Sequence, residues 1–224
     1  MSGLSVIIPS LNAAETLGPV LEAVRGAPVS EILVIDGGST DASRAIAVDH
    51  GARVITTGRG RGHQMHQGAA AAAGPWLLFL HADTRLDPGW RPAARDFMDD
   101  PASPARAGAF RLHLDSDRHA ARRVERLVAW RCRTLGLPWG DQGLLIHADL
   151  LDMIGGYPDM PLMEDVTLAR RIGRRRLTML DADAVTSAAR YERDGWWARP
   201  LRNAVLLSLH FLGVPPRILL RLYG

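Results

Sequence analysis

The chain has 224 residues, 27 basic and 24 acidic side chains, a net charge of +3, 47% hydrophobic residues and one cysteine. This length supplies one sizeable hydrophobic core but is short for two ordinary domains, and the apolar fraction excludes the disordered and low-complexity classes. No lysine is present, so all 27 basic residues are arginine, and mechanisms that need a lysine amine, including the Walker A loop, are excluded.

The first part of the chain alternates between apolar strands and helices. A capping box formed by Asn12 and Glu15 is predicted to begin the first helix, and Ser39, Thr40 and Asp41 offer caps to the second. We expect strands at 4–9, 32–35, 53–57 and 76–80, and helices through Val24, over 42–50 and over 63–73. This alternation is typical of a parallel sheet with helices on both faces, which binds ligands at the carboxyl ends of its strands.

The second part changes character. We expect helices at 88–98, 117–135 and 164–171, strands at 107–114 and 177–180, and turns within 140–147 and at 155–158. The predicted apolar stripe of the 117–135 helix contains Val124, Leu127, Val128, Cys132 and Leu135. The last 30 residues are predicted to be helical, with a break at Pro215 and Pro216.

Three short motifs follow predicted strands. Asp36-Gly-Gly-Ser-Thr-Asp41 places a carboxylate and flexible glycines, including Gly38, before a helix, which suits a nucleotide but also an ordinary turn. Arg59 and Arg61 lie in a glycine-rich segment that suits a diphosphate or is simply a solvated basic loop. His81-Ala-Asp83 could hold a divalent cation, although Asp83 could equally cap a turn.

A pair of carboxylates opens the predicted helix at Glu164. Acidic residues in a first helical turn are favoured by the helix dipole, so a structural role is sufficient to explain both. Adjacent side chains on a helix also point in different directions, so Asp165 could face a cleft as a general base while Glu164 is held elsewhere.

In order and spacing, these motifs resemble the family-2 glycosyltransferases, which have the GT-A fold. The matching segments are Val-Ile-Ile-Pro-Ser-Leu-Asn, Val-Ile-Asp-Gly-Gly-Ser-Thr-Asp, Phe-Leu-His-Ala-Asp, Gly-Gly-Tyr and Glu-Asp-x-x-Leu, between Leu4 and Arg171. Trp-Gly-Asp-Gln-Gly and Tyr-Glu-Arg-Asp-Gly-Trp-Trp look like a bacterial subgroup associated with radical-SAM or selenium-related genes.

The resemblance implies roles for individual residues. The nucleotide would be bound by Pro9, Asn12, Glu15, Asp36, Gly38, Arg59, Arg61 and His81. Asp83 matches the last acidic residue of the Asp-x-Asp motif and would hold Mn²⁺ or Mg²⁺, with His81 in place of the first. Asp165 matches the catalytic base, beside Glu164, and the acceptor or diphosphate would meet Asp141, Gln142, Arg190 or Arg193.

The resulting hypothesis is an inverting transferase that moves a sugar from a nucleotide donor, most simply a UDP-sugar, to an unidentified hydroxyl acceptor. A nucleotidyltransferase of related topology and a non-catalytic nucleotide-sugar binding protein are the alternatives. We expect one GT-A α/β domain, with a nucleotide-binding half (1–83), an acceptor half (84–190) and a helical tail (191–224), and no nucleic-acid partner. No secretory signal is visible, so a cytoplasmic location is expected. The tail suits a peripheral contact with the inner face of the membrane or a homodimer interface, although an ordinary packed terminal helix is the commoner outcome.

Overall fold

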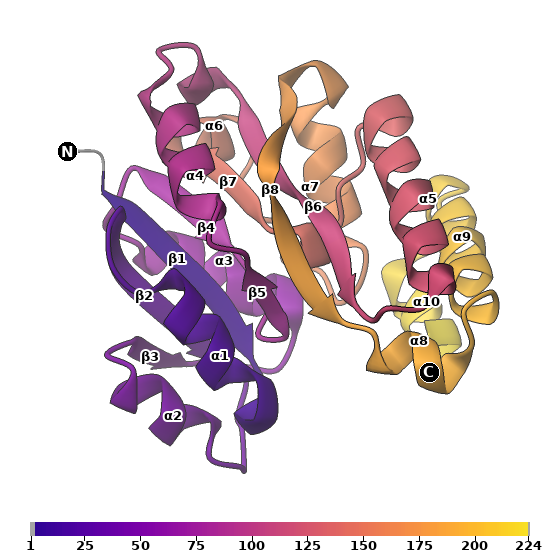
Figure 1. Ribbon diagram of the computed structural model, residues 1–224, viewed down its shortest axis with the longest axis horizontal. Helices are drawn as coiled ribbons and strands as arrows, with labels where there is room; N and C mark the ends of the chain where they lie inside the picture. The colour runs from indigo at the N-terminus through magenta and orange to yellow at the C-terminus, as the bar shows by residue number, and fades with distance from the viewer. Residues whose placement is uncertain (1–2, 224) are drawn as a thin grey trace.

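The structure is a computed structural model, and it describes residues 3–223. Its centre is an eight-stranded sheet in the order β3-β2-β1-β4-β7-β6-β8-β5, flanked by helices (Figure 1). The expected α/β class is confirmed. The strands are β1 (Leu4–Ser10), β2 (Val29–Asp36), β3 (Arg53–Thr56), β4 (Trp76–Phe79), β5 (Thr84–Leu86), β6 (Ala107–Asp115), β7 (Leu144–His147) and β8 (Leu177–Ser187).

The first four strands are parallel, and β1, β4 and most of β2 are buried. Alternate side chains of β1 and β2 serve opposite faces: Ile8 packs toward α1 (Ala14–Val24), and Ile7 packs toward Met65 of α3 (Arg61–Ala71). Helix α2 (Ser43–Asp49) lies against α1. In the register of the parallel pair, Ser10 is opposite Asp36, so the loops after β1 and β2 meet at one edge of the sheet.

The second half joins this sheet through an antiparallel strand. Strand β7 pairs antiparallel with both β4 and β6, whereas β6 and β8 are parallel to each other and β5 pairs antiparallel with β8. The helices of this half are α4 (Trp90–Asp99), α5 (His119–Leu135), α6 (Ala148–Met153) and α7 (Glu164–Ile172), with short 3-10 turns at Ser103–Ala105, Gly140–Gln142 and Arg174–Arg176.

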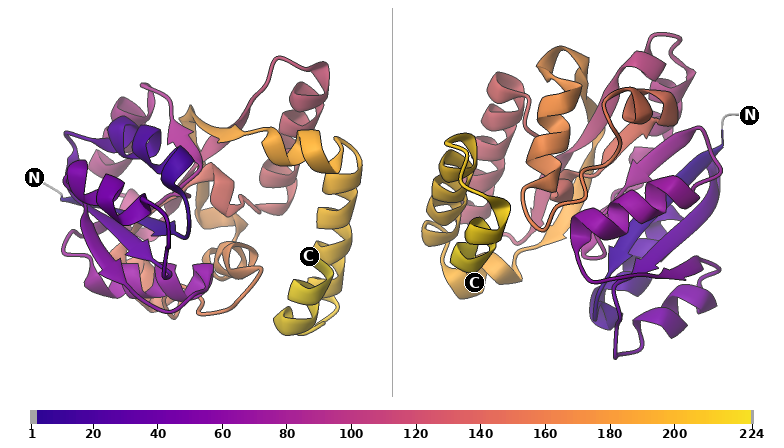
Figure 2. Two further views of the ribbon diagram at one scale, coloured as in Figure 1. Left: turned by 90° about the horizontal axis from the view of Figure 1, so that it is seen from below. Right: turned by 180° about the vertical axis from the view of Figure 1, so that it is seen from behind.

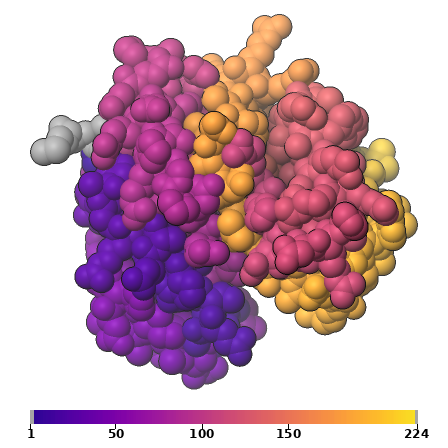
Figure 3. All heavy atoms as spheres, in the orientation of Figure 1, coloured from indigo at the N-terminus to yellow at the C-terminus, as the bar shows by residue number. Residues whose placement is uncertain are grey.

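The chain ends in helices α8 (Ala189–Asp194), α9 (Ala198–Phe211) and α10 (Pro216–Tyr223). Figure 2 shows α9 and α10 at one end of the molecule, remote from β3 and α2. Figure 3 shows the same end as a bulge beside the α5 segment. Leu206 and Leu219 attach α9 and α10 to a cluster that includes Leu137 and Val166. Within residues 3–223, no helix is long and apolar enough to cross a membrane.

Several local predictions were wrong. Asn12 does not cap α1, because its backbone adopts a positive φ of 50° and its side chain bonds to the loop after β2. Leu127 and Leu135 are exposed, and the buried stripe of α5 instead includes Ala121 and Arg131.

Other helices and strands have bounds that differ from those predicted. The short strand predicted at 177–180 is the eleven-residue β8, and β5 and α6 were not predicted. Helix α3 begins at Arg61, so this arginine lies in a first helical turn and not in the preceding loop.

Candidate active site

The loops after β1 and β2 are joined into one edge by polar contacts. Asn12 Oδ1 accepts hydrogen bonds from the backbone nitrogen of Thr40, at 2.9 Å, and from the hydroxyl group of Thr40. The carboxylate of Asp41 accepts one from Ala14 N at 3.0 Å. Asp36 is fully buried and accepts bonds from the backbone nitrogens of Gly38 and Ser39, both at 3.1 Å. This edge is therefore preformed, with a carboxylate at its centre.

Gln64 of α3 links the ends of β1 and β2 through its side chain. Its side-chain amide is buried and donates to the carbonyl groups of Ser10 (2.8 Å) and Ile35 (2.6 Å). A Cβ at position 37 would lie 3.1 Å from this amide, a tight contact that glycine avoids. Pro9 lies in β1 opposite Ile35, and Glu15 is exposed in the first turn of α1.

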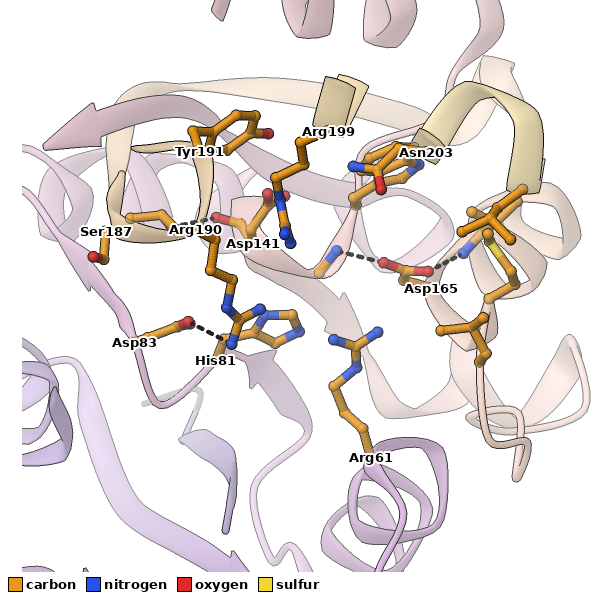
Figure 4. Close-up of a pocket in the computed structure, with 17 residues that line it drawn as sticks. Arg61, His81, Asp83, Asp141, Asp165, Ser187, Arg190, Tyr191, Arg199 and Asn203 are labelled. Carbon is orange, nitrogen blue, oxygen red and sulfur yellow. Dashed lines mark hydrogen bonds and ion pairs between the residues drawn. The ribbon is translucent and has the colours of Figure 1, made fainter. Parts of the chain in front are cut away.

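A cavity of about 110 Å³ opens beside this edge, where the two halves of the chain meet (Figure 4). It collects residues from α3, the end of β4, the Gly140–Gln142 turn, α7, α8 and α9. The sequence-predicted residues that line it are Arg61, His81, Asp83, Asp141, Asp165 and Arg190. Residues separated by more than a hundred positions are thus brought to one place.

Asp165 is held by two backbone groups. Its Oδ2 accepts a hydrogen bond from Gly140 N at 2.9 Å, and its Oδ1 accepts one from Val166 N at 2.8 Å. Met163, at φ 63°, turns the chain sharply before α7, so Glu164 and Asp165 leave in different directions. The carboxylate of Asp165 borders the cavity, so it can accept a proton from a bound hydroxyl group.

Glu164 points the other way and is buried, with only 1% of its side chain exposed. It forms an ion pair with Arg61, whose own side chain is 37% exposed at the cavity. Burial raises the pKa of Glu164, an effect that the guanidinium of Arg61 opposes. Glu164 does not line the cavity; it positions an arginine that does.

Asp141 lies in the turn that also supplies Gly140. Its Oδ1 is buried and has no hydrogen-bond partner among the described residues, while its carbonyl oxygen accepts from Thr186 Oγ1 at 3.3 Å. Burial raises the pKa of Asp141 to about 6, and the nearby carboxylates of Asp165 and Asp83 add to this rise, which Arg131 opposes.

Asp83 is the carboxylate that the sequence predicts to hold a cation. The side chain of Asp83 is 25% exposed, and its Oδ2 lies 3.4 Å from Nη2 of Arg190. Hard cations prefer carboxylate oxygens of this kind as ligands. Within residues 3–223, no cluster of three or more His, Cys, Asp or Glu side chains is arranged to hold a metal ion alone. A cation at Asp83 would therefore need further oxygen ligands, which a diphosphate can supply.

His81 is less open to a metal than predicted. Its Nε2 is buried without a hydrogen-bond partner among residues 3–223, and it faces Gly140 so closely that a Cβ there would collide with the ring. Burial lowers the pKa of His81 well below its ordinary value, and the charges of Arg61 and Arg190 lower it further. The structure shows the imidazole packed against the Gly140 turn, and the lowered pKa favours its neutral form.

Three predicted residues lie elsewhere. Gln142 is turned into the core, where its side chain bonds to Phe110 O at 3.0 Å and Trp139 N at 3.2 Å. Arg193 is exposed and pairs with Asp194, and Arg59 is exposed outside the residues lining the cavity. Gln142 therefore fixes the turn beneath Asp141 and has no amide group left for an acceptor.

The sequence reasoning missed the contribution of the tail to the site. Tyr191, Arg199 and Asn203 line the cavity, together with Leu206 of α9. The signal available was helical spacing, because positions 199, 203 and 206 recur on one face of a helix. Trp139 is the other omission: it stacks on Arg131, with the guanidinium carbon 3.7 Å from the ring centroid.

Comparisons with known proteins agree with this arrangement. The family model described as glycosyl transferase family 2 matches residues 5–144. An uncharacterized glycosyltransferase of Mycobacterium tuberculosis is 32% identical in an alignment 168 residues long, which covers 69% of this chain and 75% of that protein.

Solved structures share the fold. Glucosyl-3-phosphoglycerate synthase from Mycobacterium tuberculosis, in complex with Mn²⁺, UDP and glucosyl-3-phosphoglycerate, gives a TM-score of 0.59 at 21% identity, covering 83% of this chain and 70% of that one. Mannosyl-3-phosphoglycerate synthase from Rubrobacter xylanophilus gives 0.60 at 19% identity, covering 94% and 75%. The match to the family model and the 32% identical relative together show that this chain is a glycosyltransferase and belongs to glycosyl transferase family 2.

Proposed function

We propose that the chain is an inverting, cation-assisted transferase that uses a nucleotide-sugar donor, with Asp165 as the general base. The observation that carries this proposal is the convergence of Arg61, Asp83, Asp165 and Arg190 on one cavity beside the Asp36 edge. One side of that cavity is cationic and suits a diphosphate, and the other presents a carboxylate held by two backbone bonds.

The reaction that this geometry supports is a single displacement. The acceptor hydroxyl gives its proton to Asp165 as its oxygen forms a bond to the anomeric carbon of the sugar. The bond from that carbon to the diphosphate oxygen breaks, and the nucleoside diphosphate leaves with the electron pair. Attack opposite the leaving group inverts the anomeric configuration. Arg61 lines the same cavity and would stabilise the negative charge that develops on the diphosphate.

The cofactor in this proposal is Mn²⁺ or Mg²⁺. Asp83 would hold it, and when bound it would neutralise charge on the departing diphosphate. Arg190 competes for the same carboxylate at 3.4 Å, so it would have to move when the cation arrives. Crystal structures of glucosyl-3-phosphoglycerate synthase contain Mn²⁺ or Mg²⁺ with UDP, which supports the choice of cation and of a uridine donor.

The finer assignments rest on sequence motifs. Asp36, at the edge formed by Pro9 and Asn12, is proposed to contact the base of the nucleotide. Residues 1–83 would bind the donor and residues 84–190 the acceptor, within one GT-A domain. The Trp-Gly-Asp-Gln-Gly motif supports membership of the subgroup associated with radical-SAM or selenium-related genes.

Calorimetry with UDP in the presence and absence of Mn²⁺ tests donor and cation binding together. We expect Mn²⁺ to strengthen UDP binding to the unmodified chain, and the enhancement to disappear in Asp83→Asn. Asp117→Asn, an exposed carboxylate elsewhere, is the matched control and should retain the enhancement. Absence of UDP binding would refute the donor assignment, and release of pyrophosphate from UTP would instead support a nucleotidyltransferase.

A further inference from the structure

Helix α9 turns polar side chains as well as Leu206, Leu207 and Leu209 toward the body of the protein. The face that meets the body of the protein carries Arg199, Asn203, Leu206 and His210, and the first three of these line the cavity. Positions 199, 203, 206 and 210 recur at helical spacing, so they form one continuous inner face. A surface helix ordinarily turns apolar residues inward and polar residues outward.

The opposite side of α9, with the tryptophan before it, forms what we call the outer face: Trp197, Leu201, Val205, Ser208 and Leu212. Trp197 is 74% exposed, Leu201 67% and Leu212 80%. Ile218, Leu220 and Leu222 of α10 are also exposed, whereas Leu219 is buried. Exposed apolar side chains gathered on a helix face in this way indicate an interaction site.

The charge of the C-terminal segment that contains α9 and α10 indicates what kind of surface it contacts. From Gly195 to Gly224 the sequence has four arginines and no acidic residue. Arg217 and Arg221 flank the exposed leucine and isoleucine side chains of α10, and within residues 3–223 neither takes part in an ion pair. A symmetric second copy would bring this acid-free segment against itself, whereas an anionic lipid surface complements it.

We propose that the outer face of α9, together with α10, lies on an anionic phospholipid surface. The apolar side chains would enter the boundary between headgroups and acyl chains, and Arg217 and Arg221 would meet the phosphates. The inner face of the same helix borders the cavity, so docking would hold the cavity beside the membrane. This inference goes beyond the transferase activity, and its test requires no turnover.

Co-sedimentation with vesicles tests the proposal. Vesicles of phosphatidylglycerol and phosphatidylcholine in equal parts are compared with phosphatidylcholine alone. We expect the chain to bind the anionic vesicles, and binding to weaken as salt is added. The double variant Leu201→Gln/Leu212→Gln should lower the partition coefficient at least tenfold. Val48→Gln/Met153→Gln removes equally exposed apolar side chains from α2 and α6 and should leave it unchanged.

The arginines are tested separately. Arg217→Gln/Arg221→Gln should weaken binding to anionic vesicles by about fivefold per arginine and leave binding to neutral vesicles unaffected. Arg53→Gln/Arg95→Gln, at exposed positions of β3 and α4, is the matched control. Trp197→Phe should retain binding but reduce the blue shift of tryptophan emission that vesicles produce.

Three results would overturn the proposal. Equal binding by the chain and by Leu201→Gln/Leu212→Gln would show that the outer face is not the contact. A concentration-dependent dimer that this variant dissociates, without vesicle binding, would assign the face to a second copy. A monomer that binds no vesicles would show that the face remains in solvent. Thermal unfolding of the variants verifies that they are folded, and the changed positions are exposed.

Discussion

The buried carboxylate of Asp141 should cost the protein stability at neutral pH. Its pKa is raised from 3.8 to about 6, with burial as the largest cause, and its Oδ1 lacks a partner among the described residues. Above pH 6 the side chain is ionised in both the folded and the unfolded chain, but ionisation is less favourable in the folded one. Asp141→Asn keeps the size of the side chain and removes this charge.

The expected gain follows from the difference between the two pKa values. A rise from 3.8 to about 6 corresponds to ~3 kcal/mol of unfolding free energy at pH 7. Because the pKa of Asp141 is higher in the folded chain, the protonated carboxyl group stabilises the fold at pH values below its pKa in the unfolded chain. This contribution is lost as the pH rises through its pKa in the folded chain. The gain from the substitution should therefore shrink to about 1 kcal/mol near pH 4.5, between the two values.

Thermal unfolding at several pH values measures this effect. At pH 7 we expect the melting temperature of Asp141→Asn to rise by about 6 to 12 °C, with a clearly smaller rise near pH 4.5. Asp117→Asn, at an exposed position, should change little at either pH. A variant less stable than the parent at pH 7, or a gain that does not depend on pH, would refute the reasoning.

Three further substitutions probe the surroundings of the cavity. Arg61→Gln should lower the unfolding free energy by about 2 kcal/mol in urea titrations, because the buried carboxylate of Glu164 loses its counter-charge. Gly140→Ala should cost about 1 to 3 kcal/mol, because the new Cβ meets the ring beside the turn. Arg190→Gln should strengthen Mn²⁺ binding measured by calorimetry, because Asp83 loses its competing cation.

Matched substitutions separate these effects from general damage. Gly18→Ala lies within α1, where a Cβ finds only ordinary contacts, so it should stabilise the chain by about 0.5 to 1 kcal/mol. Arg193→Gln removes a neighbouring arginine that pairs with Asp194, so Mn²⁺ affinity should stay unchanged. Unaltered stability of Arg61→Gln, or equal Mn²⁺ affinity in Arg190→Gln and Arg193→Gln, would contradict the assigned contacts.

The first half of the fold could be predicted because its signals are local. The runs Val6 to Pro9 and Ile32 to Ile35 are continuously apolar, as is typical of strands buried on both faces. The carboxylates that follow such strands meet at one edge by the geometry of parallel pairing. Asp36 and Asp83 are therefore recognisable as candidates from the order of residues alone, and so is the acidic pair at the start of α7.

The remainder depends on tertiary contacts that no local pattern specifies. Asn12 has the residue type of a helix cap, yet its side chain bonds to a loop 28 positions away. Gln142 stands beside Asp141 in a motif, but packing turns its amide into the core. Arg199 enters the cavity from a helix whose own pattern indicates a membrane or dimer surface as readily as an active-site wall.

The role of Asp165 is the central claim, and one comparison tests it most directly. UDP release from UDP-glucose, in the presence of a panel of hydroxyl acceptors that includes phosphoglycerate, is measured for the parent chain and for Asp165→Asn, with UDP affinity measured alongside. We predict that release falls at least a hundredfold while UDP affinity stays the same, because the variant cannot accept the proton. Unchanged release in Asp165→Asn would contradict the assignment of the base.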